Sequence, residues 1–389
     1  MFMLCSCRKS NMSDTVRPDI SNPIEYSVYT VSTKGLDPVN KYNLEDYAFG
    51  VFGFWSPSDQ IFPGSEFCNN LYIDNGKGIV ETVDENKIWK CDPKAYWPLA
   101  HNVSFFAYSP YFDKVQPYDD EEGNPIQPEL RLPSADYSTS AFSSALPRGT
   151  FSPKKNITKQ TDLCVAIPQL NLNASNGPVN LEFYHTLTRI EFYINIKGSR
   201  TTDVEYQVEQ LAIEGILETN NFTFSTSEPN APIQWDPATD DSQYGSFVLT
   251  DSDAPPQIQK QTWINYTTDE NGEPITENGK PKYTKINNLD NGRLYLLPQS
   301  LTDRAQITLQ IALYKGNSST SYTRLGSLQP ITIKLPTTTP WLPSKTIKYY
   351  MTIDLGSGSS DTYIGTEITG VMEAWKESGN THSQVIPIE

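Results

Sequence analysis

The sequence predicts an all-β fold built from two β-sandwich domains in tandem. Apolar and polar residues alternate wherever a pattern can be seen, which is the period of a strand with one buried face. Proline and glycine are frequent, with 29 and 22 residues among 389, and indicate many chain turns. No long stretch shows an amphipathic helix with capping residues. A chain of this length exceeds one ordinary core, so we expect more than one domain.

The first half of the chain contains one alternating strand and two strands that are apolar throughout. Ile24, Tyr26, Val28 and Thr30 would share one face of the first strand. The runs 48–55 and 103–108 are almost entirely apolar, as expected of strands buried on both sides. Residues 113–162 show little alternation, and we interpret them as long surface connections with at most one short edge element.

A chain break at Ser175-Asn176-Gly177-Pro178 predicts the domain boundary, with one sandwich over residues 22–175 and the other over 176–389. Apolar residues then occupy odd positions from Val179 to Leu187 and even positions from Ile190 to Ile196. This change of parity requires a bulge or a single turn. Later strands and hairpin turns are predicted at 307–313, 331–335, 347–353, Asn271-Gly272, Asn278-Gly279 and Asn291-Gly292.

The N-terminus resembles the end of a bacterial lipoprotein signal. Leu4-Cys5-Ser6-Cys7 matches the pattern in which the last cysteine, here Cys7, is acylated, although the basic and long apolar parts of a signal are missing. Residues 1–21 are therefore interpreted as a signal remnant followed by a polar tether. The alternative is a disordered start whose cysteines have no role. No later segment is apolar enough to cross a membrane, so membrane contact would come through the lipid alone.

Composition and motifs argue against several classes of function. A formal charge of −16 and an isoelectric point near 4.7 disfavour nucleic-acid binding. The chain has three histidines and lacks Gly-x-Ser-x-Gly, a phosphate loop, an EF-hand and Cys-x-x-Cys, so we expect no catalytic site, no metal and no cofactor. Cys68 and Cys91 could pair, or Cys68, Cys91 and Cys164 could be separate buried thiols.

Two further features are ambiguous. His185 and Arg189 flank the parity change, either as part of a binding pocket or, as we prefer, as side chains that satisfy backbone groups freed by a bulge. The seven tryptophans are spread along the chain without a cluster that would indicate sugar binding.

Several segments together resemble the fimbrillin-like proteins of Bacteroidales, the subunits of type V pili. The segments are Leu4-Cys5-Ser6-Cys7, Phe49-Gly50-Val51-Phe52-Gly53-Phe54, Tyr96-Trp97-Pro98, Val103–Pro110, Val179–Ile190 and Trp375. The resemblance implies an outer-membrane surface lipoprotein of two transthyretin-like sandwiches that does no catalysis. Its partners would be other fimbrial subunits, together with ligands on host or bacterial surfaces.

In that family, a protease removes an N-terminal strand and a strand from the next subunit fills the groove. Carried over here, the removed segment would contain Ile24, Tyr26 and Val28, and the donor would be residues 383–389 with Ile386 and Ile388 on one face. The family's cleavage usually follows an arginine, whereas this chain has Lys34-Gly35. Either a protease accepts Lys34, or the subunit keeps its own strand. The alternative function is a surface glycan-binding lipoprotein that does not polymerise.

Overall fold

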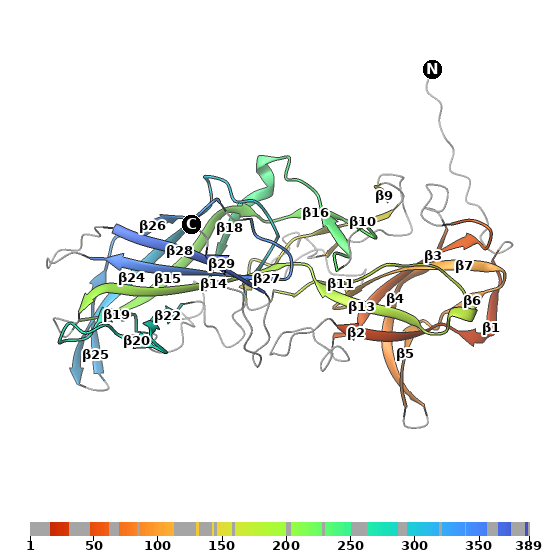
Figure 1. Ribbon diagram of the computed structural model, residues 1–389, viewed down its shortest axis with the longest axis horizontal. Coiled ribbons are helices and arrows are strands. Elements are labelled where there is room, and N and C mark those ends of the chain that lie inside the picture. The colour runs from red at the N-terminus through yellow and green to blue at the C-terminus, as the bar shows by residue number, and fades with distance from the viewer. Residues whose placement is uncertain are drawn as a thin grey trace, which may run out of the picture.

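The computed structural model confirms the all-β class. It describes residues 16–30, 47–61, 70–83, 86–112, 130–131, 142–143, 146–157, 160–199, 204–227, 230–249, 263–286, 294–318, 321–338, 340–355, 365–374 and 386–387. The regular elements of these residues are β-strands and two short 3-10 helices, η5 (Ala174–Asn176) and η6 (Asp241–Gln243). The strands form an elongated molecule, with the early strands at one end and the late strands at the other (Figure 1).

One end of the molecule is a closed sheet. Its strands are β2 (Glu25–Thr30), β3 (Phe49–Pro57), β4 (Leu71–Val83), β5 (Asn86–Asp92), β7 (His101–Ser109), β11 (Cys164–Ala166), β12 (Gln169–Leu172) and β13 (Val179–His185). They are ordered β11-β13-β2-β5-β4-β3-β7-β12, and β11 also pairs with β7, which closes the ring. The enclosed core includes Phe49, Phe105 and Leu181.

A short two-stranded sheet precedes β2. It consists of β1 (Pro18–Pro23) and β6 (Tyr96–Pro98), which run antiparallel. Residues 18–21, which the sequence analysis assigned to a tether, therefore belong to a strand.

The other end of the molecule is a sandwich of two sheets. One contains β14 (Thr188–Ser199), β19 (Asn265–Thr268), β22 (Thr284–Lys285), β23 (Leu294–Leu296), β27 (Lys345–Asp354), β28 (Gly365–Ala374) and β29 (Ile386–Pro387). The other contains β15 (Val204–Leu217), β18 (Tyr244–Val248), β24 (Gln306–Ser318), β25 (Ser321–Ser327) and β26 (Ile331–Lys334). The sequence predicts that alternating apolar residues form one face of each of these strands. Residues of those faces, such as Ile307, Ile333 and Ile347, are buried between the sheets.

A third sheet joins the two ends. It is ordered β17 (Ile233–Trp235), β16 (Asn220–Phe224), β10 (Leu146–Phe151) and β8 (Leu130–Arg131), and β9 (Phe142–Ser143) pairs with β10. It packs on the outer faces of β3 and β7, where Phe52 and Phe106 lie in its apolar cluster. Because Phe49 and Phe105 on the same strands face the closed core, the prediction of strands buried on both sides is confirmed.

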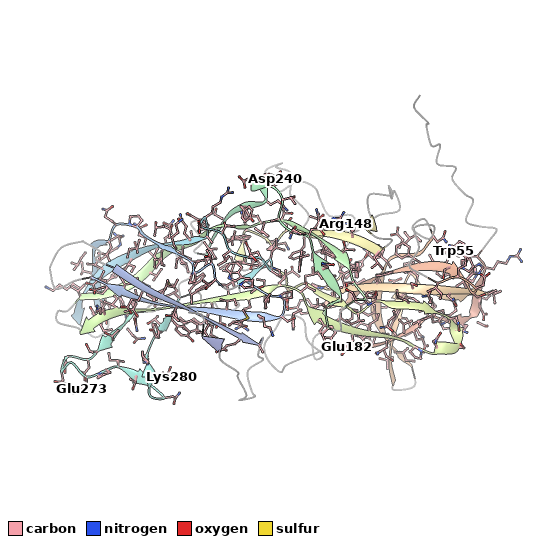
Figure 2. All side chains as sticks on the ribbon, turned by 45° about the horizontal axis from the view of Figure 1, so that its top comes forward. Trp55, Arg148, Glu182, Asp240, Glu273 and Lys280 are labelled. Atoms are coloured by element: carbon pink, nitrogen blue, oxygen red, sulfur yellow. The ribbon has the colours of Figure 1, made fainter. Side chains whose placement is uncertain are left out.

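This joining sheet corrects the interpretation of residues 113–162 as surface connections. β10 lies within that range, and its Phe151 is fully buried. Its alternation was hidden by Pro147 and Gly149. Arg148 of β10 forms an ion pair with Asp236, which binds the first half of the sequence to the second near the middle of the molecule (Figure 2).

The parity change marks the passage from one sheet to the other. β13 ends at His185 in the closed sheet, and β14 starts at Thr188 in the sandwich. The first strand buries odd positions and the second buries even positions, because each faces a different core. The chain thus crosses about ten residues after the predicted boundary at 175/176, since β13 pairs with β2 and β11.

The predicted hairpin turn at Asn278-Gly279 is confirmed between β20 (Thr276–Glu277) and β21 (Lys280–Pro281). Asn278 and Gly279 have positive φ angles of 53° and 75°, as a tight hairpin of this kind requires. Gly272 also has a positive φ, and its N–H donates to the carbonyl of Asp269, so a turn forms at Asn271-Gly272. The turn predicted at Asn291-Gly292 lies outside the described residues.

Candidate functional site

The strand-exchange hypothesis concerns β2, which occupies an interior place in the closed sheet. β2 runs parallel to β13, with Tyr26 to Thr30 opposite Val179 to Phe183. On its other side it is antiparallel to β5, where the pairing covers only Glu25 with Lys90 and Tyr26 with Trp89. The strand is therefore held along its length on one side and at its start on the other.

The side chains of β2 and the residue before it fill the core of the closed sheet. Ile24 is 1% exposed and Tyr26 is 4% exposed, whereas Val28 is half-buried and packs against the same core. Burial raises the pKa of the Tyr26 hydroxyl well above its ordinary value, and the adjacent Cys91 adds to this effect. Ile24 and Tyr26 are thus core residues, and removal of the strand would leave an apolar slot.

Of the other predicted site residues, Ile386 is the one that lies in the part of the chain that the structure describes. Cys7, Lys34, Gly35 and Ile388 lie outside the described residues. Ile386 belongs to β29, which pairs with β28 at the edge of the sandwich, with Ile386 opposite Met372 and Pro387 opposite Val371. The described part of the candidate donor, β29, therefore lies in a different sheet from the candidate slot.

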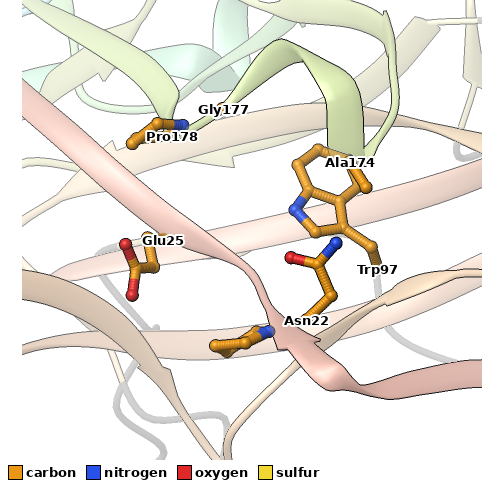
Figure 3. Close-up of a pocket in the computed structure, with 7 residues that line it drawn as sticks. Asn22, Glu25, Trp97, Ala174, Gly177 and Pro178 are labelled. Carbon is orange, nitrogen blue, oxygen red and sulfur yellow. The ribbon is translucent and has the colours of Figure 1, made fainter.

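A shallow pocket of about 200 Å³ lies at the start of β2. Figure 3 shows the Asn22 amide beside the Trp97 indole, with Glu25 on the other side of the opening. Pro23 and three residues that precede β13, Ala174, Gly177 and Pro178, complete the lining. Trp97 is only 3% exposed, so the pocket does not present an open aromatic face on which a sugar could stack. The pocket exists only while β1 and β2 are in place, because Asn22 of β1 and Glu25 of β2 form part of its wall.

The tryptophans of the described residues do not form a sugar platform elsewhere. Trp97 and Trp341 are buried, and Trp55, Trp89, Trp235 and Trp263 are half-buried. Trp235 donates through its indole N–H to the carbonyl of Thr186, at the crossover between the sheets. Trp375 lies outside the described residues.

A cluster that the sequence analysis missed lies at the end of β13. Nδ1 of His185 is 2.7 Å from an Asp162 carboxylate oxygen and 3.4 Å from Sγ of Cys164. Asp162, Cys164 and His185 are all buried. We call these residues the Asp162–Cys164–His185 cluster. Cys164 and His185 are direct partners in the β11–β13 register, and this pairing of distant segments leaves no short motif in the sequence.

At the crossover, the side chain of His185 contacts Asp162 and Cys164, and the expectation that His185 and Arg189 satisfy freed backbone groups stays a prediction. The carbonyls of Thr186 and Leu187 accept from Trp235 and from the backbone N–H of Ser344, respectively. Arg189 donates to the Glu191 carboxylate. Cys91 is a buried free thiol in the closed core, which agrees with the alternative of separate thiols. Its suggested partner Cys68 lies outside the described residues.

The fold defines an all-β protein of two joined units whose first unit is closed by a near-terminal strand. A family model described as fimbrillin-like matches residues 45–375. The chain therefore belongs to the fimbrillin-like family, and this membership makes it a non-enzymatic fimbrial or adhesive protein of the cell surface. Among the described residues, no helix is long and apolar enough to cross a membrane.

The chain is also similar to several solved structures. A fimbrial protein from Bacteroides vulgatus is 18% identical, with a TM-score of 0.60, and the match covers 91% of this chain and 100% of that chain. Candidate cell adhesion proteins from Bacteroides uniformis and Bacteroides ovatus are 14% and 12% identical, each with a TM-score of 0.42. Those matches cover 91% and 92% of this chain and 99% of each of theirs. No curated protein matches the chain.

Proposed function

We propose that this protein is a structural or adhesive fimbrial subunit that assembles by strand exchange between copies or with related subunits. The observation that carries the proposal is the position of β2. Ile24 and Tyr26 are almost fully buried in a core that the rest of the closed sheet would leave open without them. A strand with matching apolar side chains from another subunit could fill the same slot.

The backbone of β13, on one side of the slot, favours such an addition. Without β2, the N–H and C=O groups of β13 that now pair with it would face an open edge. An incoming strand would recover those hydrogen bonds and bury its alternate side chains, so main-chain pairing supplies affinity and the pockets supply specificity. Cleavage after Lys34 would separate β1 and β2 together from the rest of the chain.

The C-terminal residues 383–389 are the proposed donor. Their described part, β29, pairs with β28 through only two residue positions at the outer edge of the sandwich. Releasing so short a pairing costs little relative to the burial of two isoleucine side chains, which is worth about 1.5–3 kcal/mol each. Ile386 and Ile388 would supply these side chains on one face of the donor.

The test uses a chain from residue 8 with a site-specific protease sequence placed after Lys34. Light scattering should show a monomer before cleavage and larger species afterwards, and the cleaved chain without residues 383–389 should stay monomeric. A cleaved, folded, full-length chain that remains monomeric would contradict strand exchange. It would favour the alternative of an unprocessed anchor, tip or surface protein that keeps β2.

The proposed anchor is a lipid on Cys7, which would hold the protein at the outer membrane. Mass spectrometry of the native protein should find acyl groups on an N-terminal Cys7. Cys7→Ser should abolish labelling by a radioactive fatty acid, while Cys5→Ser should leave it. Unchanged labelling of Cys7→Ser would contradict this assignment.

A further inference from the structure

We propose that the Asp162–Cys164–His185 cluster is a structural binding site for a thiophilic divalent cation of the zinc type. The proposal is independent of fimbrial assembly. Thiolate, imidazole and carboxylate are the three kinds of ligand that zinc uses in proteins. Here one of each converges, with a ligand atom of each residue within 4.8 Å of the others.

One of the ligand separations matches that of a zinc site, and a second would match it after a small rotation of one side chain. Zinc bonds of about 2.0–2.3 Å in a tetrahedral arrangement place neighbouring ligand atoms about 3.3–3.7 Å apart. The separation of 3.4 Å between Sγ of Cys164 and Nδ1 of His185 already falls in this range. The contact of 2.7 Å between Nδ1 and Asp162 would lengthen by a rotation of the Asp162 carboxylate.

A buried oxygen of Asp162 that lacks a hydrogen-bond partner points independently to a cation. This residue is 0% exposed, and its Oδ1 has no hydrogen-bond partner although it is buried. A buried carboxylate oxygen without a partner is costly, because it has lost its hydration without replacement. A divalent cation between the three side chains would compensate the charge of the carboxylate and of the thiolate together.

The surrounding backbone holds the ligands in place. Cys164 and His185 are fixed by the β11–β13 pairing, and β11 is also paired with β7. The Thr186 hydroxyl and N–H both donate to the carbonyl of Leu163, the residue between Asp162 and Cys164. Zinc in proteins is usually four-coordinate, so a water molecule would complete the coordination of the ion. The ion would tie the end of β13 to β11 just before the chain enters the sandwich.

The test titrates the full chain, dialysed against a chelator, with Co²⁺ and then with Zn²⁺. We expect one equivalent of Co²⁺ to give thiolate charge-transfer absorption and the visible bands of tetrahedral cobalt, and Zn²⁺ to displace it and to raise the melting temperature. Cys164→Ser should remove the charge-transfer band and weaken zinc binding at least about tenfold. Asp162→Asn should weaken binding without removing the band. Cys91→Ser removes the other buried thiol that the structure describes in this core and is the matched control.

A second measurement needs no substitution. The chain has three histidines, and zinc should shift the ring resonances of His185 while leaving those of His101 and His382 unchanged. Absence of a cobalt band together with absence of a His185 shift would overturn the proposal. Unchanged zinc affinity in a folded Cys164→Ser variant would do so as well.

Discussion

Tyr26 of β2 contacts Phe49 of β3 edge to face across the interior of the closed sheet, with ring centroids 5.5 Å apart. The same ring meets Phe105 of β7 edge to face at 6.2 Å. Neither β3 nor β7 pairs with β2 through the backbone. The strand is therefore held by aromatic packing with the opposite wall as well as by hydrogen bonds with its neighbours.

This packing predicts a large effect of Tyr26→Ala. The substitution removes both ring contacts from a residue that is 4% exposed, and it should lower the free energy of unfolding by about 3–5 kcal/mol. Tyr26→Phe keeps the ring and is the matched control, with a change below about 1.5 kcal/mol. Denaturant unfolding measures both. Equal stability of the alanine variant and the native chain would show that β2 does not contribute to the core.

The joining sheet predicts a specific requirement for glycine at position 149. A Cβ on Gly149 would lie 2.5 Å from the ring of Phe222 on β16, inside the apolar cluster between the two ends of the molecule. Gly149→Ala should therefore destabilise the chain by about 1–3 kcal/mol through overpacking.

Gly326 on β25 provides the control for this substitution. Nothing lies within 4 Å of a Cβ built at Gly326, so Gly326→Ala should change the unfolding free energy by less than about 0.5 kcal/mol. If the two alanine variants unfold at the same denaturant concentration, β10 does not pack on β16 as described.

Glu191 predicts a specific loss of stability in acid. Its carboxylate, which is 5% exposed, accepts from Arg189, Lys285 and Tyr193. Burial alone would raise the pKa of Glu191, but the two cations and the Tyr193 hydroxyl lower it to about 2, from an ordinary 4.5. Burial lowers the pKa of Lys285 despite this partner, so the cost of burying the amine offsets part of the gain.

A depressed carboxyl pKa stabilises the fold fully above the unfolded pKa and loses this contribution as the pH falls through the folded pKa. The loss should thus occur between about pH 4.5 and 2, and it should amount to at most about 3 kcal/mol. Glu191→Gln should reduce stability at pH 7 and flatten the dependence in this range. The exposed Glu273→Gln is the control. An unchanged acid profile in Glu191→Gln would contradict the role of this network.

The strands and their buried faces could be predicted because the alternation of apolar and polar residues shows which side of a strand is buried. This pattern identified β2, β13, β14 and β27 correctly. Alternation does not record which core the buried side meets. The parity change after Leu187 could thus indicate a bulge or a crossing between sheets, and only the pairing of β13 with β2 distinguishes them.

The Asp162–Cys164–His185 cluster could not be predicted from the sequence, because it depends on the register between distant segments. Asp162 and Cys164 contact His185 only because β11 is aligned with β13, and no local sequence motif predicts that register. β10 was overlooked because its proline and glycine interrupt the pattern, although Gly149 is required for close packing. The roles of Cys7, Lys34, Gly35, Ile386 and Ile388, and the transthyretin-like strand order, stay predictions.

Hydrogen exchange of β13 after cleavage at Lys34 tests strand exchange most directly. The β13 amides that face β2 should be protected in the uncleaved chain and again in oligomers of the cleaved chain. They should exchange rapidly in the cleaved chain that lacks both its released N-terminal segment and residues 383–389. If oligomers form without residues 383–389, or if these amides stay unprotected in oligomers of the full-length cleaved chain, the slot is not filled by a donated C-terminal strand.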